Sequence, residues 1–346
     1  MARKIRVGII GAGGISRQHV EGYRKCPNAE VIATCDVVAE RARAQAEEYG
    51  IPRWFKSDTA MLKLDELDAV SVCTPNYAHK RVAVKALRAG KHVLVEKPIA
   101  MNAREAQAMI DAAREAGKKL QVGLDKRFAP DVQFAKRVIS EGRIGEPYYG
   151  RSLSVRRRGV PSWGVFGQKK LQGGGPLIDI GVHSIDFTWF LMGCPKPVAV
   201  SGKTYETIGR TRGHVGQFGP WDWKTYTVED FAAALVRFEN GATMTVESAF
   251  CVNLDRDVFG CHVAGEKGGV GISPLSVQIE MGGHLVDCTP NHLPRLSSYH
   301  AEVAAFVDAI ARDRPSRVPG EEIIWVQKII DGIYASSKAD KEVRIK

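Results

Sequence analysis

The feature that most constrains the fold of this chain is a glycine-rich turn near its N-terminus. An apolar run over residues 5–10 leads directly into Gly11-Ala-Gly13-Gly14-Ile15-Ser16, and a helical pattern follows to about Lys25. We interpret the segment as a buried strand, a turn and a helix. In that context Gly11 permits a tight turn, and Gly13 lets the backbone approach a pyrophosphate at the helix N-terminus.

A second strand pattern, over residues 31–35, ends in Asp36, about twenty residues beyond the small residues of the turn. An acid at this point accepts hydrogen bonds from both ribose hydroxyls of NAD and repels the additional phosphate of NADP. Val37 and Val38 offer no cation for that phosphate, and Arg41 is the one nearby candidate. The turn and the acid together predict a dinucleotide site that prefers NAD to NADP.

Strand and helix patterns keep alternating up to residue 124. Further strands are predicted over 69–74, 92–96 and 120–124, with helices over 38–49, 78–90 and 102–117 and a helical turn near 58–64. Such a series forms a parallel sheet through right-handed connections, and its ligands bind at the carboxyl ends of the strands. We therefore expect an α/β Rossmann domain over residues 1–124.

Two of these strand ends carry unusual residues, namely the stretch from Cys73 to His79 (CTPNYAH) and Glu96-Lys97-Pro98. Lysine is usually a surface residue, but a strand's carboxyl edge followed by proline favours a site role for Lys97. The expected cofactor-binding residues come from the turn and the strand ends: Gly11, Gly13, Gly14, Ile15, Asp36, Thr74, Pro75, Asn76, His79, Glu96 and Lys97.

A second glycine-rich stretch, residues 173–186, reads GGGPLIDIGVHSID. Pro176 favours a helix start, and the apolar residues that follow predict a largely buried helix. The spacings of Asp179, His183 and Asp186 place all three on one helical face. A carboxylate four residues from a histidine can hold the imidazole ring and raise its basicity, as a general base requires. On this stretch alone, a buried histidine satisfied by its neighbour, or a metal pair, fits as well.

Taken in order and spacing, the glycine turn, Asp36, CTPNYAH, EKP and GGGPLIDIGVH resemble the glucose–fructose oxidoreductase/inositol dehydrogenase (Gfo/Idh/MocA) family over essentially the whole chain. The resemblance implies Lys97, Asp179 and His183 as the catalytic set, without a metal. It also implies hydride transfer between NAD and a secondary alcohol of a sugar, sugar derivative or cyclitol. We expect His183 to accept the proton, Asp179 to hold its ring and Lys97 to stabilise the alkoxide. Lys97 as the base is the alternative.

Beyond residue 124 the patterns are mainly those of strands, and Asn240-Gly241 is a strong hairpin signal. We expect an α+β domain over residues 125–346 with a large, mostly antiparallel sheet. In the family that face commonly mediates dimers, which implies a homodimer or homotetramer. The expected helices cover 131–141, 300–313 and 321–337, and the expected strands cover 148–158, 198–204, 229–238, 243–251, 258–264, 277–281 and 285–288.

Residues for substrate recognition are less sharply marked. Trp163, Trp221 and Trp223 lie in loops, where each could stack on a sugar ring or pack into the core. The basic run 156–158 could receive a carboxylate, although strand alternation would point at most two of its three arginines the same way. The expected substrate-binding residues are Lys97, Arg127, Trp163, Asp179 and His183.

Composition narrows the functional classes. The net charge of +10 is spread along the chain without a nucleic-acid-binding motif, so we expect no nucleic-acid partner. Seven cysteines, an odd number without a CxxC pair, predict reduced thiols and a cytoplasmic protein. No apolar stretch is long enough to span a membrane, and we expect no membrane partner.

Two rival functions share the dinucleotide motifs. One is a glycosidase that uses NAD transiently to oxidise a sugar ring, which would release sugar without net NADH. The other is a non-catalytic dinucleotide-binding regulator. Such a regulator does not need Lys97, Asp179 and His183 together, so their joint presence favours an enzyme.

Overall fold

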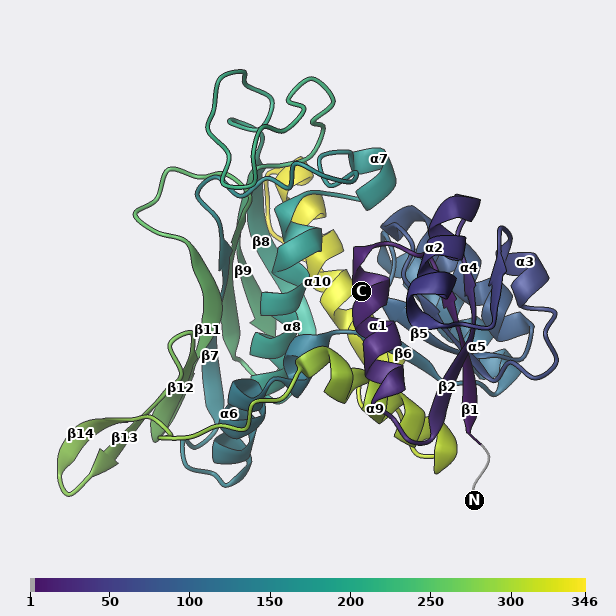
Figure 1. Cartoon of the computed structure of the whole chain (residues 1–346). Helices are drawn as coiled ribbons and strands as arrows, with labels where there is room; N and C mark the ends of the chain where they lie inside the picture. The colour runs from purple at the N-terminus through teal and green to yellow at the C-terminus, as the bar shows by residue number, and fades with distance from the viewer. Residues whose placement is uncertain (1–3) are drawn as a thin grey trace. The chain divides into compact units, whose positions relative to one another are not determined.

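The computed structural model describes residues 4–346 and divides into two compact units (Figure 1). The first unit comprises the chain up to Phe128 together with Leu296–Ile324, and the second comprises Ala129–Arg295 with Trp325–Lys346. We expected one boundary, after residue 124, whereas the first unit extends to Phe128 and also includes a segment from near the C-terminus. Helix α9 (Ser298–Ala311) belongs to the first unit because its apolar side, through Val303 and Phe306, packs into that unit's core.

A parallel six-stranded sheet forms the first unit, in the order β3 (Arg53–Phe55), β2 (Ala29–Cys35), β1 (Ile5–Ile10), β4 (Ala69–Val72), β5 (His92–Glu96) and β6 (Leu120–Gly123). Its strands are apolar along most of their length, which suits a sheet covered on both faces. The chain order reverses between β1 and β4. The carboxyl ends of these two strands therefore mark the point where ligands bind in such sheets.

Helices connect these strands as the alternating pattern predicts, and the α/β fold expected for this part of the chain is confirmed. The short strand β3 was not predicted, because three residues are too few for a periodic signal. The helices are α1 (Gly14–Arg24), α2 (Ala39–Tyr49), α3 (Asp58–Met61), α4 (Asn76–Arg88) and α5 (Ala103–Ala116), followed by the short 3₁₀ turn η1 (Asp125–Phe128).

In the second unit, nine strands form one sheet, in the order β14 (His284–Cys288), β13 (Ser276–Met281), β12 (Gly268–Ile272), β11 (Val258–Gly265), β7 (Pro147–Val155), β10 (Thr243–Ala249), β9 (Phe231–Phe238), β8 (Pro197–Tyr205) and β15 (Val343–Arg344). Every neighbouring pair is antiparallel except β7 and β10. The predicted large, mostly antiparallel sheet is therefore confirmed. Glycine-rich β12 was missed, since glycine disfavours strands.

One face of this sheet is covered by helices. Helix α8 (Val182–Leu191) packs on β7 and β11, and Figure 1 shows α8 and α10 (Gly320–Ala339) on the same side of the strands. α8 is preceded by η2 (Leu177–Gly181), a single π-helical turn, and by the short α7 (Lys169–Gln172). Helix α6 (Pro130–Ser140) also contacts α8.

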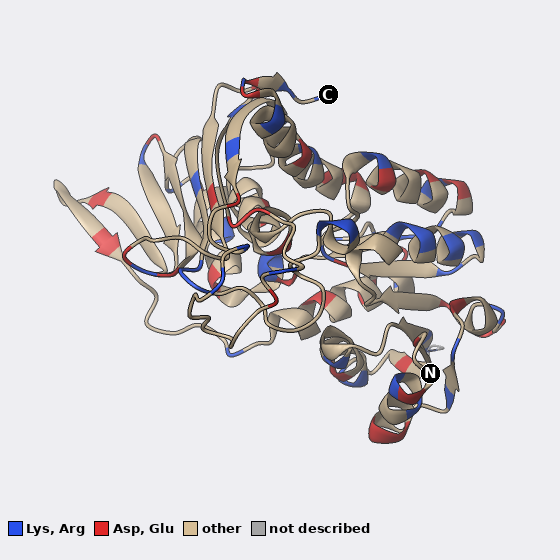
Figure 2. Ribbon diagram, turned by 90° about the horizontal axis from the view of Figure 1, so that it is seen from above, with Lys and Arg blue, Asp and Glu red and all other residues tan. Residues whose placement is uncertain are grey.

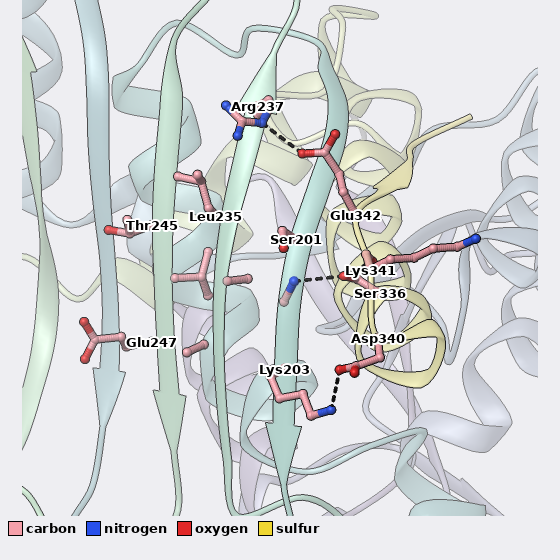
Figure 3. A pocket seen from close by; sticks show the side chains of 14 residues that line it. Ser201, Lys203, Leu235, Arg237, Thr245, Glu247, Ser336, Asp340, Lys341 and Glu342 are labelled. Carbon is pink, nitrogen blue, oxygen red and sulfur yellow. Dashed lines mark hydrogen bonds and ion pairs between the residues drawn. The ribbon is translucent and has the colours of Figure 1, made fainter.

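Residues on the opposite face alternate with the buried ones, as expected for an antiparallel sheet with one solvated side. Ala233, Leu235 and Arg237 of β9 point to this side, whereas Ala232 and Val236 are fully buried. A hollow of about 670 Å³ lies over β8, β9 and β10 beside the end of α10 (Figure 3). Its rim charges form ion pairs, Lys203 with Asp340 and Arg237 with Glu342.

Acidic and basic residues are interspersed over the surface of each unit (Figure 2). Over residues 4–346, no helix combines the length and apolar character that crossing a membrane requires. All seven cysteines are free thiols, and burial raises the pKa of Cys35, Cys251 and Cys261 to about 12.

Candidate functional site

The glycine turn between β1 and α1 combines one crowded glycine with two open ones. Gly11 has a φ of +97°, and a Cβ there would lie 2.6 Å from the carbonyl oxygen of Cys73. A Cβ on Gly13 or Gly14 would meet nothing within 4 Å. Gly13 is the N-cap of α1 and provides no side-chain cap. The helix N-terminus therefore presents backbone N–H groups to open space, where they can hold a phosphate.

Asp36 follows the end of β2 and lies directly beside this turn. Its two carboxylate oxygens accept hydrogen bonds from the backbone N–H groups of Ala12, at 2.9 Å, and Val38, at 2.8 Å. Val37 is 78% exposed, and neither valine supplies a cation. A carboxylate fixed here can accept further hydrogen bonds from ribose hydroxyls, because each oxygen has more than one lone pair.

After β4, the residues predicted to bind a cofactor divide into two groups. The Thr74 hydroxyl oxygen is buried and has no hydrogen-bond partner among residues 4–346, which fits a site completed by a ligand. His79 is fully buried, and its ring nitrogens lie 2.9 Å from Pro98 O and 2.8 Å from Thr74 O. Burial lowers the pKa of His79. His79 therefore holds the turns after β4 and β5 together instead of facing a ligand.

Glu96, at the end of β5, belongs to a buried polar network that the motif analysis did not anticipate. Its Oε1 lies 2.8 Å from His19 Nε2, and His19 Nδ1 lies 3.0 Å from the hydroxyl of Ser71. Burial opposes protonation of His19, but interactions with Cys73 and Glu96 outweigh it and raise its pKa well above the usual value. We therefore interpret His19 and Glu96 as a buried ion pair.

Glu302 of α9 lies close to the same pair. Potential ligand atoms of His19, Glu96 and Glu302 all lie within 4.8 Å of one another, close enough to surround a metal ion. The direct 2.8 Å contact between His19 and Glu96 is already a good hydrogen bond. The His19–Glu96 pair is thus satisfied by a proton, and we assign no metal to the cluster.

Lys97 follows Glu96 at the carboxyl end of β5. Its backbone N–H donates to Glu96 Oε2 at 3.2 Å, and Pro98 immediately follows it. The buried network thereby fixes the backbone from which this half-buried lysine projects. Lys97 thus sits at the same sheet edge as Thr74 and the glycine turn, where ligands bind in parallel sheets.

In the second unit, the three glycines before η2 are required by backbone conformation at Gly173 and by close packing at Gly174 and Gly175. Gly173 has a φ of +89°, a Cβ on Gly174 would clash with the Tyr334 hydroxyl, and one on Gly175 would lie 2.4 Å from Glu229 O. The Tyr334 hydroxyl and the Glu229 backbone occupy the space beside Gly174 and Gly175, and next to them lies the Glu229 side chain. It accepts hydrogen bonds from the backbone N–H groups of Gly175, at 3.0 Å, and Leu177, at 3.2 Å, and from the Tyr334 hydroxyl, at 2.8 Å.

Glu229 thus caps the turn that carries Asp179, and burial raises its pKa. A carboxylate at a helix N-terminus satisfies backbone donors and favours the local dipole. Sequence reasoning missed this role. The available signal was two adjacent acids, Glu229 and Asp230, directly before the apolar run of β9.

Asp179 lies in the π-helical turn η2 and His183 in the first turn of α8, so the predicted helix is present but its first turn is π. Asp179 is 8% exposed, His183 is half-buried and Asp186 is fully buried. π turns inserted in α-helices are frequent at functional sites. A half-buried histidine beside a nearly buried carboxylate is suited to accept a proton from a ligand.

Two loops pack directly on this turn. Ile180 forms a small core with Val160 from the loop after β7, and with Tyr226 and Val228 from the loop after β8. Asp230 fixes the second loop by accepting hydrogen bonds from the backbone N–H groups of Thr207, Ile208 and Gly209. Trp221 also packs on this core and donates to Gly209 O at 2.8 Å, so it packs rather than stacks on a ligand. The adjacent acids Glu229 and Asp230 therefore hold the turn and the loop together.

The strand expected over residues 148–158 ends at Val155, so the basic run follows β7 and its three arginines have different surroundings. Arg157 is exposed, and Arg158 donates to Val252 O and Asn253 Oδ1. Arg156 is half-buried: burial lowers its pKa, while the charges of Asp179 and Asp257 act in the opposite direction. The charges of Arg156 and Asp179 therefore interact.

Arg127, predicted to bind substrate, lies in η1 of the first unit. It is 3% exposed and forms an ion pair with Glu322, which follows Pro319-Gly320 in the same unit. Burial of an arginine against its own carboxylate partner is typical of a packing role. We leave Arg127 out of the proposed substrate site.

Comparison with known proteins agrees with both halves of the chain. Residues 5–124 match the oxidoreductase family with an NAD-binding Rossmann fold (GFO_IDH_MocA), and residues 132–271 match the GFO/IDH/MocA C-terminal domain. The D-glucoside 3-dehydrogenase of Escherichia coli (strain K12) is 34% identical over 343 residues, which cover 99% of this chain and 97% of that protein.

Two further relatives extend the comparison. The scyllo-inositol 2-dehydrogenase (NAD(+)) of Bacillus subtilis (strain 168) is 28% identical, over 90% of this chain and 87% of that protein. A structure of levoglucosan dehydrogenase in complex with NADH and levoglucosan shares the fold, with a TM-score of 0.86 and 24% identity over 99% of this chain and 100% of that chain. The chain therefore belongs to the GFO/IDH/MocA family of oxidoreductases with an NAD-binding Rossmann fold.

Proposed function

We propose that this protein is an NAD-dependent dehydrogenase that oxidises a secondary hydroxyl group of a sugar, a sugar derivative or a cyclitol. The observation that carries the proposal is the pair Asp179, on a π turn that Glu229 and Tyr334 clamp, and His183, in the first turn of the helix that follows. A buried clamp of this kind holds a carboxylate and an imidazole in fixed geometry, as acid–base catalysis requires.

The cofactor site is proposed at the carboxyl edge of the first unit's sheet. Gly11, Gly13, Gly14 and Ile15 form the turn for the pyrophosphate, and the open space over Gly13 and Gly14 supports this assignment. Asp36 accepts the ribose hydroxyls, which favours NAD over NADP. The site is completed by residues after the strand ends: Thr74, Pro75, Asn76, Glu96 and Lys97. The Thr74 hydroxyl, which has no hydrogen-bond partner among residues 4–346, would form one with the ligand. Bound NAD would supply the hydride acceptor.

His183 is assigned as the group that accepts the proton of the substrate hydroxyl. Asp179 keeps the ring oriented and stabilises the imidazolium that forms. Lys97 donates a hydrogen bond to the reacting oxygen and stabilises its developing negative charge. The opposite division, with Lys97 as the base, makes a different prediction: replacing His183 would then leave turnover near that of the wild type.

The substrate class follows from the relatives and from the residues around Asp179. Their names refer to a glucoside, an inositol and levoglucosan, all polyhydroxylated rings. Arg156 supplies a cation whose charge acts on Asp179, which suits a sugar with several hydroxyl groups. Within this class we favour a glucoside.

Incubation of the purified protein with NAD⁺ and a panel of glucosides, free hexoses and inositols tests the proposal. We expect NADH to accumulate with at least one member of the panel. Release of sugar from a glycoside without net NADH would instead assign the chain to glycosidases that oxidise the ring transiently. NAD⁺ binding without any turnover would favour a regulator.

Assembly is proposed as a homodimer or homotetramer formed through the solvated face of the nine-stranded sheet. The support is that this face remains without a covering layer in the second unit, over β8, β9 and β10 (Figure 3). Sedimentation equilibrium measures the state directly, and a monomer at micromolar concentration would contradict the proposal.

A further inference from the structure

An exposed aromatic cluster lies on the surface loops of the second unit. Trp163 contacts Phe218 with ring centroids 5.4 Å apart and Phe166 with centroids 6.3 Å apart, both edge to face. Trp163 is 56% exposed and Phe218 is 41% exposed. Exposed apolar groups that gather in one place often mark a binding site. We call Trp163, Phe166 and Phe218 the aromatic platform.

The platform is held in place by hydrogen bonds between its two loops. The Ser162 hydroxyl donates to Phe218 O at 2.5 Å, and the backbone N–H of Gln217 donates to Arg158 O at 2.8 Å. The Gln217 side chain donates to Asp257 Oδ2, also at 2.8 Å. A ring that binds here therefore meets an ordered surface, and little entropy is lost in arranging it.

The same loops place the platform next to the Asp179 turn. Val160, three residues before Trp163, packs in the small core that contains Ile180. The guanidinium of Arg156 lies 5.5 Å from the centroid of the Phe218 ring, and its charge also acts on Asp179. A single arginine side chain thus links the platform to the turn that carries the proposed catalytic pair.

The aromatic side chains of the platform are suited to bind a ligand that contains a ring. Aromatic faces bind the C–H face of a pyranose or another aromatic ring, and the donors of Arg156 suit hydroxyl or ether oxygens at its edge. Arg156 contacts Phe218 of the platform while its charge acts on Asp179, so a ring on the platform is assigned separately from the ring whose hydroxyl reacts. It has to be a second ring, joined to the reacting sugar.

We propose that the aromatic platform is a subsite for the aglycone or second sugar ring of a glycoside whose first ring is oxidised at Asp179 and His183. The inference rests on the dehydrogenase function proposed above and narrows its substrate class to glycosides that carry a second ring. If the platform only packs the two loops together, one-ring and two-ring substrates should respond alike to its removal.

The test compares one-ring and two-ring glucosides that share the same reacting half. Steady-state oxidation of methyl β-D-glucoside is measured against phenyl β-D-glucoside and cellobiose, each with saturating NAD⁺. The wild type is expected to show a kcat/KM about tenfold higher for the two-ring substrates, mainly through a lower KM. Equal values for all three substrates would overturn the subsite while leaving the dehydrogenase function intact.

Two substitutions then test whether the preference for two-ring substrates depends on the aromatic platform. Trp163→Ala and Phe218→Ala are each expected to abolish the tenfold advantage of the two-ring substrates, while kcat/KM for methyl glucoside changes less than about twofold. Trp163→Phe keeps an aromatic face and should retain most of the advantage, which a folding defect would not allow. Tyr148→Ala is the matched control, because Tyr148 is also 56% exposed but lies near the opposite end of β7 from these loops.

Equal losses on one-ring and two-ring substrates in both alanine variants would overturn the proposal and assign the platform a packing role. If no member of the panel of glucosides, hexoses and inositols produces NADH, the dehydrogenase proposal fails separately. Titration calorimetry of phenyl glucoside into the NAD⁺-saturated protein then decides the subsite. Binding that weakens in Trp163→Ala but not in Tyr148→Ala supports it, and binding that is absent or unchanged overturns it.

Discussion

Two glycine-rich turns of this chain look alike in sequence and serve opposite purposes. Both precede a helix. The first is followed by Asp36, which we assign to cofactor binding, and the second by Asp179 and His183, which we assign to catalysis. At the first, a Cβ on Gly13 or Gly14 would meet only open space. At the second, a Cβ on Gly174 or Gly175 would collide with Tyr334 or Glu229. The first turn leaves room for a ligand, whereas the second leaves room for the protein's own side chains.

This difference shows two uses of a small residue. In the first unit the helix N-terminus remains uncapped by any side chain, so its backbone donors are available to an anion. In the second unit the corresponding donors of Gly175 and Leu177 are consumed by Glu229. An anion is therefore expected at the first turn only, and the second turn is built for rigidity.

The largest effect is expected from the pair that the second turn carries. His183→Asn should lower kcat by about 10²–10⁴-fold, because positioned acid–base catalysis contributes that much. NAD affinity should stay near that of the wild type, since the glycine turn is untouched. Steady-state assays measure kcat, and titration measures the affinity for NAD. The variant's circular dichroism spectrum should match that of the wild type, which shows that it is folded. Near-normal turnover would instead assign the role of base to Lys97. The double variant Asp179→Asn, His183→Asn should have a kcat little lower than that of the single His183 variant.

Alanine at each glycine turn tests the comparison directly. Gly175→Ala should destabilise the fold by about 1–3 kcal/mol, because the new methyl group meets the Glu229 backbone, which cannot move aside. Gly13→Ala should leave the melting temperature nearly unchanged but raise the Kd for NAD at least about tenfold, or 1.4 kcal/mol. Thermal melts and NAD titrations of both variants form a crossed design. A stable Gly175→Ala protein, or unaltered NAD binding by Gly13→Ala, would remove the distinction.

Removal of the clamp should give an intermediate effect. Tyr334→Phe deletes a hydrogen bond to the buried Glu229 carboxylate, and bonds to charged groups contribute about 1.5–3 kcal/mol. We expect a loss of that size in the free energy of unfolding and a lower kcat, with the KM for NAD unchanged. Denaturant titration and steady-state kinetics measure the two quantities. Asp222→Asn, which alters an exposed carboxylate of the loop after β8, is the control and should change neither.

The smallest expected effect concerns cofactor choice at the first turn. NAD should bind at least about tenfold more tightly than NADP, or 1.4 kcal/mol, because the phosphate of NADP would face Asp36. Asp36→Ser, Val37→Arg should narrow or reverse this preference. Fluorescence titration with both reduced cofactors measures it. Equal affinities in the wild type would refute our interpretation of Asp36.

Much of the fold was predictable because the signals are local. The bounds of β1 and β5 coincide with the apolar runs, and α5 begins after its Asn102 cap and ends at Gly117. The glycines at 11, 13 and 14 needed only a strand before them and a helix after them to be interpreted. Periodicity and capping act over a few residues, so the sequence carries them directly.

Other features depend on residues far apart in the chain. Tyr334 lies 105 residues from Glu229, and Glu302 lies some two hundred residues from Glu96, so neither contact leaves a local pattern. Arg127 looked available for a substrate because its partner Glu322 follows 195 residues later. Strand patterns in the same way predicted a second sheet but not its order, nor the π turn at Asp179.

By itself, the sequence determined the Rossmann domain, the family and the identity of the candidate pair Asp179 and His183, because these depend on residue type and short spacing. Tertiary structure alone decided which glycines face open space, how Glu229 fixes the turn that carries Asp179, and that the Arg156 charge acts on Asp179. The physical reason is that steric room and buried polar partners are properties of three-dimensional neighbours, which only the packed chain brings together.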